Sequence, residues 1–212
     1  MEGFIKRKIY MTVTVFLSVI CITMIIQERM LQMDWKITQT QKELAQEVFR
    51  FHVLANSDRE EDQRLKMKVK ETVIEFMKNS MGHAENADEV KKWAVLHKKD
   101  IEDISQNVIK EEGKEYTVKA KVTTGYFPDK TYGDVRFPAG MYESLRVEIG
   151  KAQGRNWWCV LYPNLCFVDA AHAVVPEEGK QQLQSVLSEE EYEMVTATSK
   201  FKIKWYFLGD HK

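Results

Sequence analysis

The chain has 212 residues and a formal net charge of −1, with 31 Lys and Arg against 32 Asp and Glu. Charges of both signs are interspersed, so no basic field favours a nucleic-acid partner. The chain carries no fixed-period repeat and no low-complexity tract, which excludes repeat arrays and linker-joined modules.

An uncharged apolar run covers residues 9–26. At a rise of about 1.5 Å per residue, its eighteen residues span roughly 27 Å, close to the hydrocarbon thickness of a bilayer. Lys6, Arg7 and Lys8 precede the run, so residues 1–8 are expected to stay cytoplasmic and the rest to face outward. No small-x-small cleavage site follows Ile26, which favours an uncleaved signal-anchor over a signal peptide.

Residues 27–48 are polar with scattered apolar positions and predict a connecting helix. Residues 49–212 are long enough for one extracytoplasmic domain with a sizeable core. Phe49, Phe51 and Val53 alternate with polar residues, which predicts a strand at the start of this domain.

Two helices are expected next. The first begins at Asp58, which has capping-box spacing to Glu61, and ends in the polar stretch 79–86. The second ends at Gly113. Their apolar stripes are Leu65, Val69, Val73 and Phe76, and then Val90, Ala94, His97, Ile101, Ile104 and Val108. His97 is interpreted as a core or boundary residue.

The pattern then changes to period two. Strands are expected over residues 116–122 and 142–149, and around Trp157, with the last two pairing as antiparallel neighbours. Residues 127–133 and 137–140 read as turns, Pro176 and Ser188 favour the starts of short helices, and 201–207 alternate as a final strand. The predicted fold is α+β: an N-terminal membrane-spanning or signal helix, then one domain with two helices and an antiparallel sheet.

A disulfide between Cys159 and Cys166 depends on the register of the hairpin that contains them. A turn formed by Tyr162 and Pro163 places the two cysteines opposite each other, but proline at the second turn position then requires a cis peptide. A turn centred on Pro163 and Asn164 moves them out of register. An extracytoplasmic location favours oxidation. Both registers stay open.

Other chemistry for these thiols is less favoured. A zinc site would need both cysteines and two histidines from His52, His83, His97 and His172, but six intervening residues exceed the usual spacing of a zinc knuckle. A thiol enzyme would pair Cys159 with His52 or His172 and with Asn156 or Asp169. Apolar neighbours would raise the pKa of that thiol. No catalytic residues, metal or cofactor are therefore predicted.

Three stretches carry a family resemblance. The element Asn156-Trp157-Trp158-Cys159-Val160 is the most specific part. The stretches are 50–58 with Asp62-Gln63 and Leu65-Lys66; 127–133 with 137–143; and 156–161 with Pro163, Leu165, Cys166 and Phe167. In this order, from Arg50 to Asp169, they resemble the stage II sporulation protein R family of endospore-forming bacteria. Met141 and Asn164 depart from the family pattern.

The resemblance implies a signalling role without catalysis. Such proteins are made in the forespore under its own sigma factor and exported into the space between forespore and mother cell. There they are needed to activate a membrane-embedded aspartic protease that cleaves the precursor of the mother-cell sigma factor. The implied partners are that protease, through its extracytoplasmic face, and the membrane, with no small-molecule substrate. The alternative is an extracytoplasmic thiol- or metal-dependent hydrolase of the envelope.

The sequence offers candidates for the surface that contacts the protease. They are His52, Asn56, Asp58, Asn156, Trp157 and Trp158. The competing interpretation is that the tryptophans belong to the core and that residues 56–58 form a turn with a helix cap.

Overall fold

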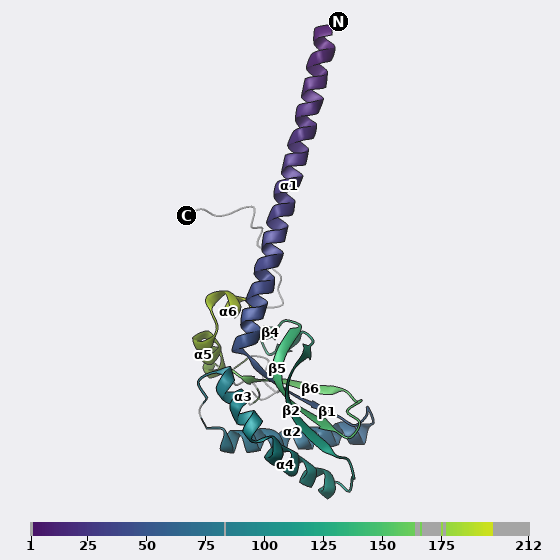
Figure 1. Ribbon diagram of the computed structural model, residues 1–212, viewed down its shortest axis with the longest axis vertical. Helices are drawn as coiled ribbons and strands as arrows, with labels where there is room; N and C mark the ends of the chain where they lie inside the picture. The colour runs from purple at the N-terminus through teal and green to yellow at the C-terminus, as the bar shows by residue number, and fades with distance from the viewer. Residues whose placement is uncertain (1, 83, 164–165, 167–174, 176, 197–212) are drawn as a thin grey trace. The chain divides into compact units, whose positions relative to one another are not determined.

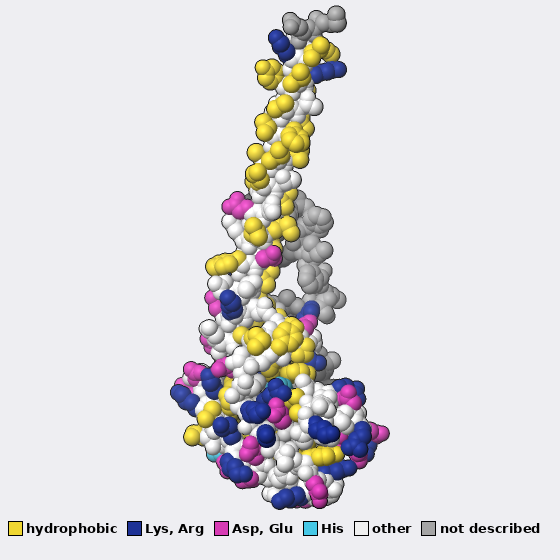
Figure 2. Space-filling model, turned by 45° about the vertical axis from the view of Figure 1, so that its right-hand side comes forward, with side chains coloured by type: hydrophobic (Ala, Val, Ile, Leu, Met, Phe, Trp, Pro, Cys, Tyr) yellow, Lys and Arg dark blue, Asp and Glu magenta, His cyan; other side chains and the backbone are white. Residues whose placement is uncertain are grey.

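The computed structural model describes residues 2–82, 84–163, 166, 175 and 177–196, and divides the chain into two units, Met1–Thr40 and Gln41–Lys212. The N-terminal helix α1 (Glu2–Glu47) provides the first unit. It is long and apolar enough to cross a membrane by length and composition. Exposed apolar side chains line it after the basic residues near its start (Figure 2). The expected N-terminal apolar helix is thus confirmed.

The second unit is an α+β domain, as predicted (Figure 1). Its remaining helices are α2 (Glu60–Ser80), α3 (Ala87–Leu96), α4 (Lys98–Glu111), α5 (Glu177–Val186) and α6 (Glu189–Thr196). Its strands are β1 (Phe49–Leu54), β2 (Val118–Phe127), β3 (Lys130–Tyr132), β4 (Val135–Phe137), β5 (Gly140–Ile149) and β6 (Asn156–Tyr162). The last predicted strand, 201–207, lies outside the described residues.

The four-stranded sheet has the order β2-β5-β1-β6, and β1 pairs parallel with β5 and antiparallel with β6. The expected antiparallel sheet is therefore mixed, and the expectation that β5 and β6 are neighbours is wrong. The connection between them passes the end of β1, where the backbone N–H groups of Gln153 and Gly154 donate to the carbonyls of Asn56 and Ala55. Strand β1 fills the space between β5 and β6 and is buried along its whole length.

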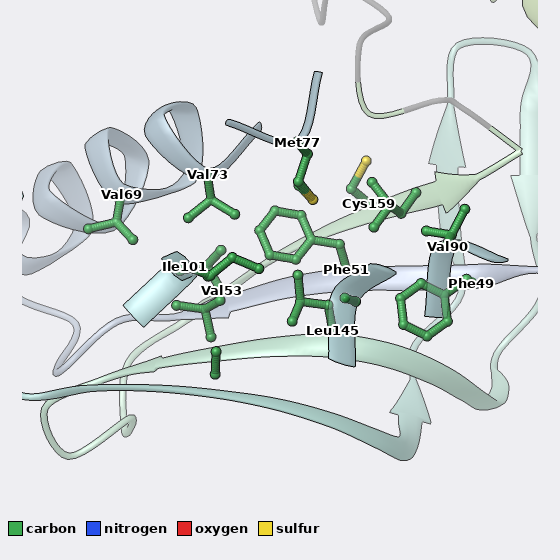
Figure 3. Packing of buried hydrophobic residues seen from close by; sticks show 14 of the residues in the cluster. Phe49, Phe51, Val53, Val69, Val73, Met77, Val90, Ile101, Leu145 and Cys159 are labelled. Carbon is green, nitrogen blue, oxygen red and sulfur yellow. The ribbon is translucent and has the colours of Figure 1, made fainter. Parts of the chain in front are cut away.

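One face of this sheet carries the main apolar core. Phe51 and Val53 of β1 meet the stripe of α2 that was predicted from the sequence, including Val69 and Val73 (Figure 3). Helices α3 and α4 add Val90 and further apolar residues to the same cluster. The alternation of β1 therefore places Phe49, Phe51 and Val53 on the helix-covered face and Arg50, His52 and Leu54 on the other.

The region predicted as two helices, before the sheet, contains three: α2, α3 and α4. The second predicted helix is divided at His97, which ends α3 and precedes α4 with φ −97° and ψ 12°. Nδ1 of His97 lies 2.7 Å from Oδ2 of Asp100 in the first turn of α4. The apolar stripe crosses the break without losing its period, which is why the pattern concealed it. The short helices α5 and α6 confirm the expected helix starts near Pro176 and Ser188.

The second face of the sheet carries a smaller apolar cluster. The stretch expected as two turns contains a short hairpin of β3 and β4. That hairpin, the end of α1 beyond Gln41, and helices α5 and α6 contribute its buried residues, among them Leu44, Phe137, Leu183 and Val195. The cluster also contains Val160, which is paired with Arg50, so it covers the part of this face near Arg50.

Cys159 and Cys166 form a disulfide with their Cα atoms 5.5 Å apart, and the Tyr162–Pro163 peptide is cis. Cys159 lies in β6 within the main core, so the bridge fastens the chain after β6 to the sheet.

Removing this bridge is expected to destabilise the domain. The variant Cys159→Ala/Cys166→Ala should lower the free energy of unfolding by about 2–3 kcal/mol, because the unfolded chain regains the entropy of a short closed loop. Urea denaturation of the full-length chain in detergent measures this. Cys21→Ala is the matched control, since Cys21 is an exposed free cysteine of α1. Equal urea midpoints for the double variant and the wild type would show that the bridge contributes nothing.

Candidate functional site

Strand register brings polar residues from distant segments into rows across the second face of the sheet. His52 of β1 is paired with Trp158 of β6 and with Arg146 of β5, and Arg146 is paired with Lys121 of β2. These four residues form the central row. The row on one side of it contains Thr123, Ser144, Arg50 and Val160, and the row on the other side contains Lys119, Glu148, Leu54 and Asn156.

Arg50 lies on this face and is fully buried. Its Nε donates to the carbonyl oxygen of Cys159 at 3.1 Å, and its Nη2 donates to the hydroxyl of Tyr132 at 3.1 Å. The guanidinium carbon lies 4.6 Å from the ring centroid of Phe127 and 4.9 Å from that of Tyr142. Aromatic faces attract a cation most strongly where water is excluded.

The rings of Phe127, Tyr132, Phe137 and Tyr142 form an aromatic box around this cation. Among the described residues, no carboxylate forms an ion pair with it. Burial lowers the pKa of Arg50 below its ordinary value, and Tyr132 and Tyr142 oppose that shift. Burial in turn raises the pKa of Tyr142 to about 12, although Arg50 lowers it. Because the box joins Arg50 to Tyr132, Tyr142 and Cys159, the three stretches that carry the family resemblance meet at this side chain.

His52 follows Arg50 on the same face and is only 4% exposed. Its ring is stacked on Trp158 with centroids 4.9 Å apart, and the ring of Phe127 lies 5.0 Å away. Neither ring nitrogen has a hydrogen-bond partner among the described residues. Burial lowers the pKa of His52 to about 3; the positive charge of Arg146 adds to the shift and Glu148 opposes it. His52 is therefore a neutral core residue at physiological pH.

Beyond His52 the face opens to solvent and becomes basic. The side chain of Lys121 is 52% exposed and that of Arg146 35% exposed. Both contact Glu148: Nζ of Lys121 lies 2.8 Å from one carboxylate oxygen, and Nε of Arg146 lies 2.8 Å from the other. Burial alone would raise the pKa of Glu148, but these ion pairs hold it below its usual value. Lys119, also exposed, lies opposite Glu148.

Asn56 and its neighbours lie past the end of β1 and tie two loops together. The Asn56 side chain donates to Oδ2 of Asp62 at 2.9 Å and accepts from the backbone N–H of Lys151 at 3.0 Å. Ser57 Oγ donates to the same Asp62 oxygen at 2.5 Å. Burial alone would raise the pKa of Asp62, but hydrogen bonds from Ser57 and Asn56, among others, hold it below its usual value. Asn56 thus anchors the β5–β6 connection to the first turn of α2.

The β5–β6 connection fits this anchor only because two positions lack a side chain. A Cβ on Gly150, whose φ is +57°, would lie 2.4 Å from Oδ1 of Asn56. A Cβ on Gly154 would lie 2.2 Å from the carbonyl oxygen of Ser57. Asp58 completes the closure, since its Oδ1 accepts from the backbone N–H of Arg155 at 2.7 Å.

The structure brings three of the six candidate residues together and separates the others. His52, Asn156 and Trp158 lie on the second face, and Oδ1 of Asn156 is buried without a hydrogen-bond partner among the described residues. Trp157 lies on the opposite face, 5.7 Å from Phe51 between ring centroids. Asn56 and Asp58 lie in the loop closure. Sequence reasoning missed Arg50, Tyr132, Tyr142, Lys121 and Arg146. They come together only through the pairing of β1 and β2 with β5 and through the contacts of Arg50 with the two tyrosines.

The geometry disfavours thiol chemistry at Cys159. The disulfide occupies its sulfur, and Cys159 is paired with Phe51, so it lies on the face opposite His52. His83, His172 and Asp169, the other residues weighed for such sites, lie outside the described residues. Among the residues that the structure describes, no group of three His, Cys, Asp or Glu side chains is placed to hold a metal ion.

The molecule is thus an α+β domain carried on a long apolar helix, with a buried arginine linking its three most distinctive segments. The family sequence model described as stage II sporulation protein R matches residues 45–172. A stage II sporulation protein R from Bacillus subtilis (strain 168) is 30% identical over 152 residues, which cover 71% of this chain and 68% of that protein. No solved structure matches the chain. The chain belongs to the stage II sporulation protein R family.

The burial of His52 gives a test by pH. The folded-state pKa of about 3 lies below the ordinary value near 6.5, so the unfolded chain binds a proton that the folded chain excludes. The neutral, buried ring therefore contributes to the free energy of unfolding. This contribution is complete above about pH 7 and is lost as the pH falls through 6.5 toward 3. When the pH is lowered from 7.5 to 5.0, the free energy of unfolding should therefore fall by about 2 kcal/mol from this residue, as measured by urea denaturation. The variant His52→Phe keeps a ring between Trp158 and Phe127 but cannot bind the proton. Its free energy of unfolding should therefore fall by about 2 kcal/mol less than that of the wild type over the same pH change. Equal losses in both proteins would show that His52 is not buried as a neutral ring.

The anchor at Asn56 gives a second test. Asn56→Ala leaves the N–H of Lys151 without its acceptor and removes a hydrogen bond from buried Asp62. The expected loss is about 2–3 kcal/mol in the free energy of unfolding, measured by urea denaturation. Lys151→Ala is the control, because it keeps the backbone N–H. A fully stable Asn56→Ala variant that has lost signalling would instead make Asn56 a partner contact.

Proposed function

We propose that this protein is an exported, non-catalytic sporulation signal. On this proposal it is made in the forespore and acts in the space between forespore and mother cell. There it activates a membrane-embedded aspartic protease that processes the precursor of the mother-cell sigma factor. Membership of the stage II sporulation protein R family carries the proposal.

The N-terminal unit supports the export route. Helix α1 is long and apolar enough to cross a membrane, and Lys6, Arg7 and Lys8 lie before its apolar run. Basic residues favour the cytoplasmic side, so the second unit is expected outside. A disulfide in that unit agrees with an oxidising compartment. Whether the apolar segment remains as an anchor or is cleaved does not alter the side on which the domain acts.

The second unit supports a binding role over hydrolysis. The sulfur of Cys159 is engaged in the disulfide, and the histidine nearest to it in register lies in an aromatic stack with a strongly lowered pKa. A protein ligand needs no such groups. It activates an enzyme by binding the active state more tightly than the inactive one, since only differential affinity moves the equilibrium. An active protease dimer is the state that this ligand would favour.

The proposal is tested by reconstitution. The full-length chain, the candidate protease and the sigma-factor precursor are co-expressed in a non-sporulating host, and cleavage of the precursor is followed by immunoblot. Cleavage is expected only when all three are present. Omitting each component and replacing the catalytic aspartates of the protease are the controls. Cleavage without this chain, or its absence although the chain is exported and folded, would contradict the proposal.

A further inference from the structure

The open part of the second face carries a local excess of positive charge. The central row and the row that contains Glu148 carry three cations, Lys119, Lys121 and Arg146, against that one carboxylate. The whole chain has a net charge of −1, so this excess belongs to the surface and not to the composition. We call these residues the basic rows. Charges arranged in this way steer a partner of opposite sign and fix its orientation.

The basic rows end at an aromatic side chain. The central row leads from Lys121 through Arg146 and His52 to Trp158, which is half-buried and held by its stacking on His52. Neighbouring strands lie about 4.8 Å apart, so Lys121 and Trp158 are about 14 Å apart across the sheet. Next to Trp158, the buried amide oxygen of Asn156 lacks a hydrogen-bond partner among the described residues. A large, rigid aromatic side chain is the kind of residue that dominates binding at the centre of an interface.

We propose that the basic rows bind an acidic extracytoplasmic segment of the protease. The segment carries two or more carboxylates, which pair with Lys119, Lys121 and Arg146, and an apolar side chain next to them, which packs on Trp158. This inference rests on the proposed function and adds to it the contact surface and the chemistry of the partner. The aromatic box around Arg50 lies in the neighbouring row of the same face, where Phe127 packs against His52 and Trp158. It supports this surface and does not take part in the contact.

Charge reversal tests the surface in the three-component assay. Lys119→Glu/Lys121→Glu in the full-length chain should reduce cleavage of the precursor about tenfold, because two attractive charges become repulsive. Lys119→Gln/Lys121→Gln should give an intermediate loss, since it removes the attraction without adding repulsion. A graded order of wild type, glutamine pair and glutamate pair is the expected result. Cleavage at the wild-type level in both pairs would overturn the inference and leave the proposed function standing.

A matched control lies on the helical side of the domain. Lys68 of α2 has a side chain that is 52% exposed, as Lys121 has, and it is also paired with a glutamate, Glu112. Lys99 of α4 is exposed and paired with Asp103. Lys68→Glu/Lys99→Glu changes the net charge as much as the test pair and should leave cleavage unchanged. An equal loss in this control would show that net charge matters and not the basic rows, and would overturn the inference.

Three measurements separate the remaining explanations. Urea midpoints show whether each variant is folded. If the glutamate pair is not folded, the cleavage level of the glutamine pair decides the test. If the wild-type chain produces no cleavage, the proposed function fails, whatever the variants do. Capture of the protease by the tagged full-length chain in neutral detergent should weaken with added salt and in the glutamate pair. Capture that needs anionic lipid would assign the basic rows to a membrane surface and overturn the inference.

Discussion

The domain depends on the burial of one guanidinium group. Arg50 is cut off from solvent, so the protein itself must replace the water that would otherwise surround its charge. A backbone carbonyl from β6, a hydroxyl from β3 and the rings of Phe127 and Tyr142 do so. These groups lie between 77 and 109 positions along the chain from Arg50, and they surround the guanidinium only when all of these segments are in place. Even then, its Nη1 stays buried without a hydrogen-bond partner among the described residues. Burying this cation therefore costs stability but specifies one arrangement of the segments.

The same residue explains why β1 has two different faces. Its odd-numbered residues enter an apolar core against α2, and its even-numbered residues, Arg50 and His52, enter a layer of aromatic rings. A strand buried on both faces commonly reads as a continuous apolar run. Here the polar even positions give the alternating pattern of a strand with one face exposed to solvent, although every residue of β1 is buried. The aromatic layer is what allows a charged and a titratable side chain at the centre of the sheet.

Local signals in the sequence predicted the elements well and their pairing poorly. The apolar helix, the stripe of α2, the strand that begins with Phe49 and the α+β class follow from periodicity alone. The order of the strands does not, because the placement of β1 between β5 and β6 depends on the contacts of Asn56 and Arg50 with residues some 80 to 110 positions away. Only part of the site was predicted, because its other residues are brought together by the same strand pairing. His52, Asn156 and Trp158 were recognised as distinctive, whereas Lys121 and Arg146 look like ordinary surface residues until register aligns them.

The residues that mark the family are chiefly those that build the domain. Arg50 orders the β3–β4 region, Asn56 closes the β5–β6 loop, and Cys159 fastens the end of β6. Each of these residues is buried and already makes contacts within the chain, so little of its surface is available to a partner. A contact surface needs exposed side chains. In the proposed surface, Trp158 of the family motif supplies the apolar contact, whereas the charged contacts use residues that the fold does not require and that carry no motif. The basic rows meet this condition, because Lys119 and Lys121 project from an edge strand while the residues beneath them fix the geometry of the sheet.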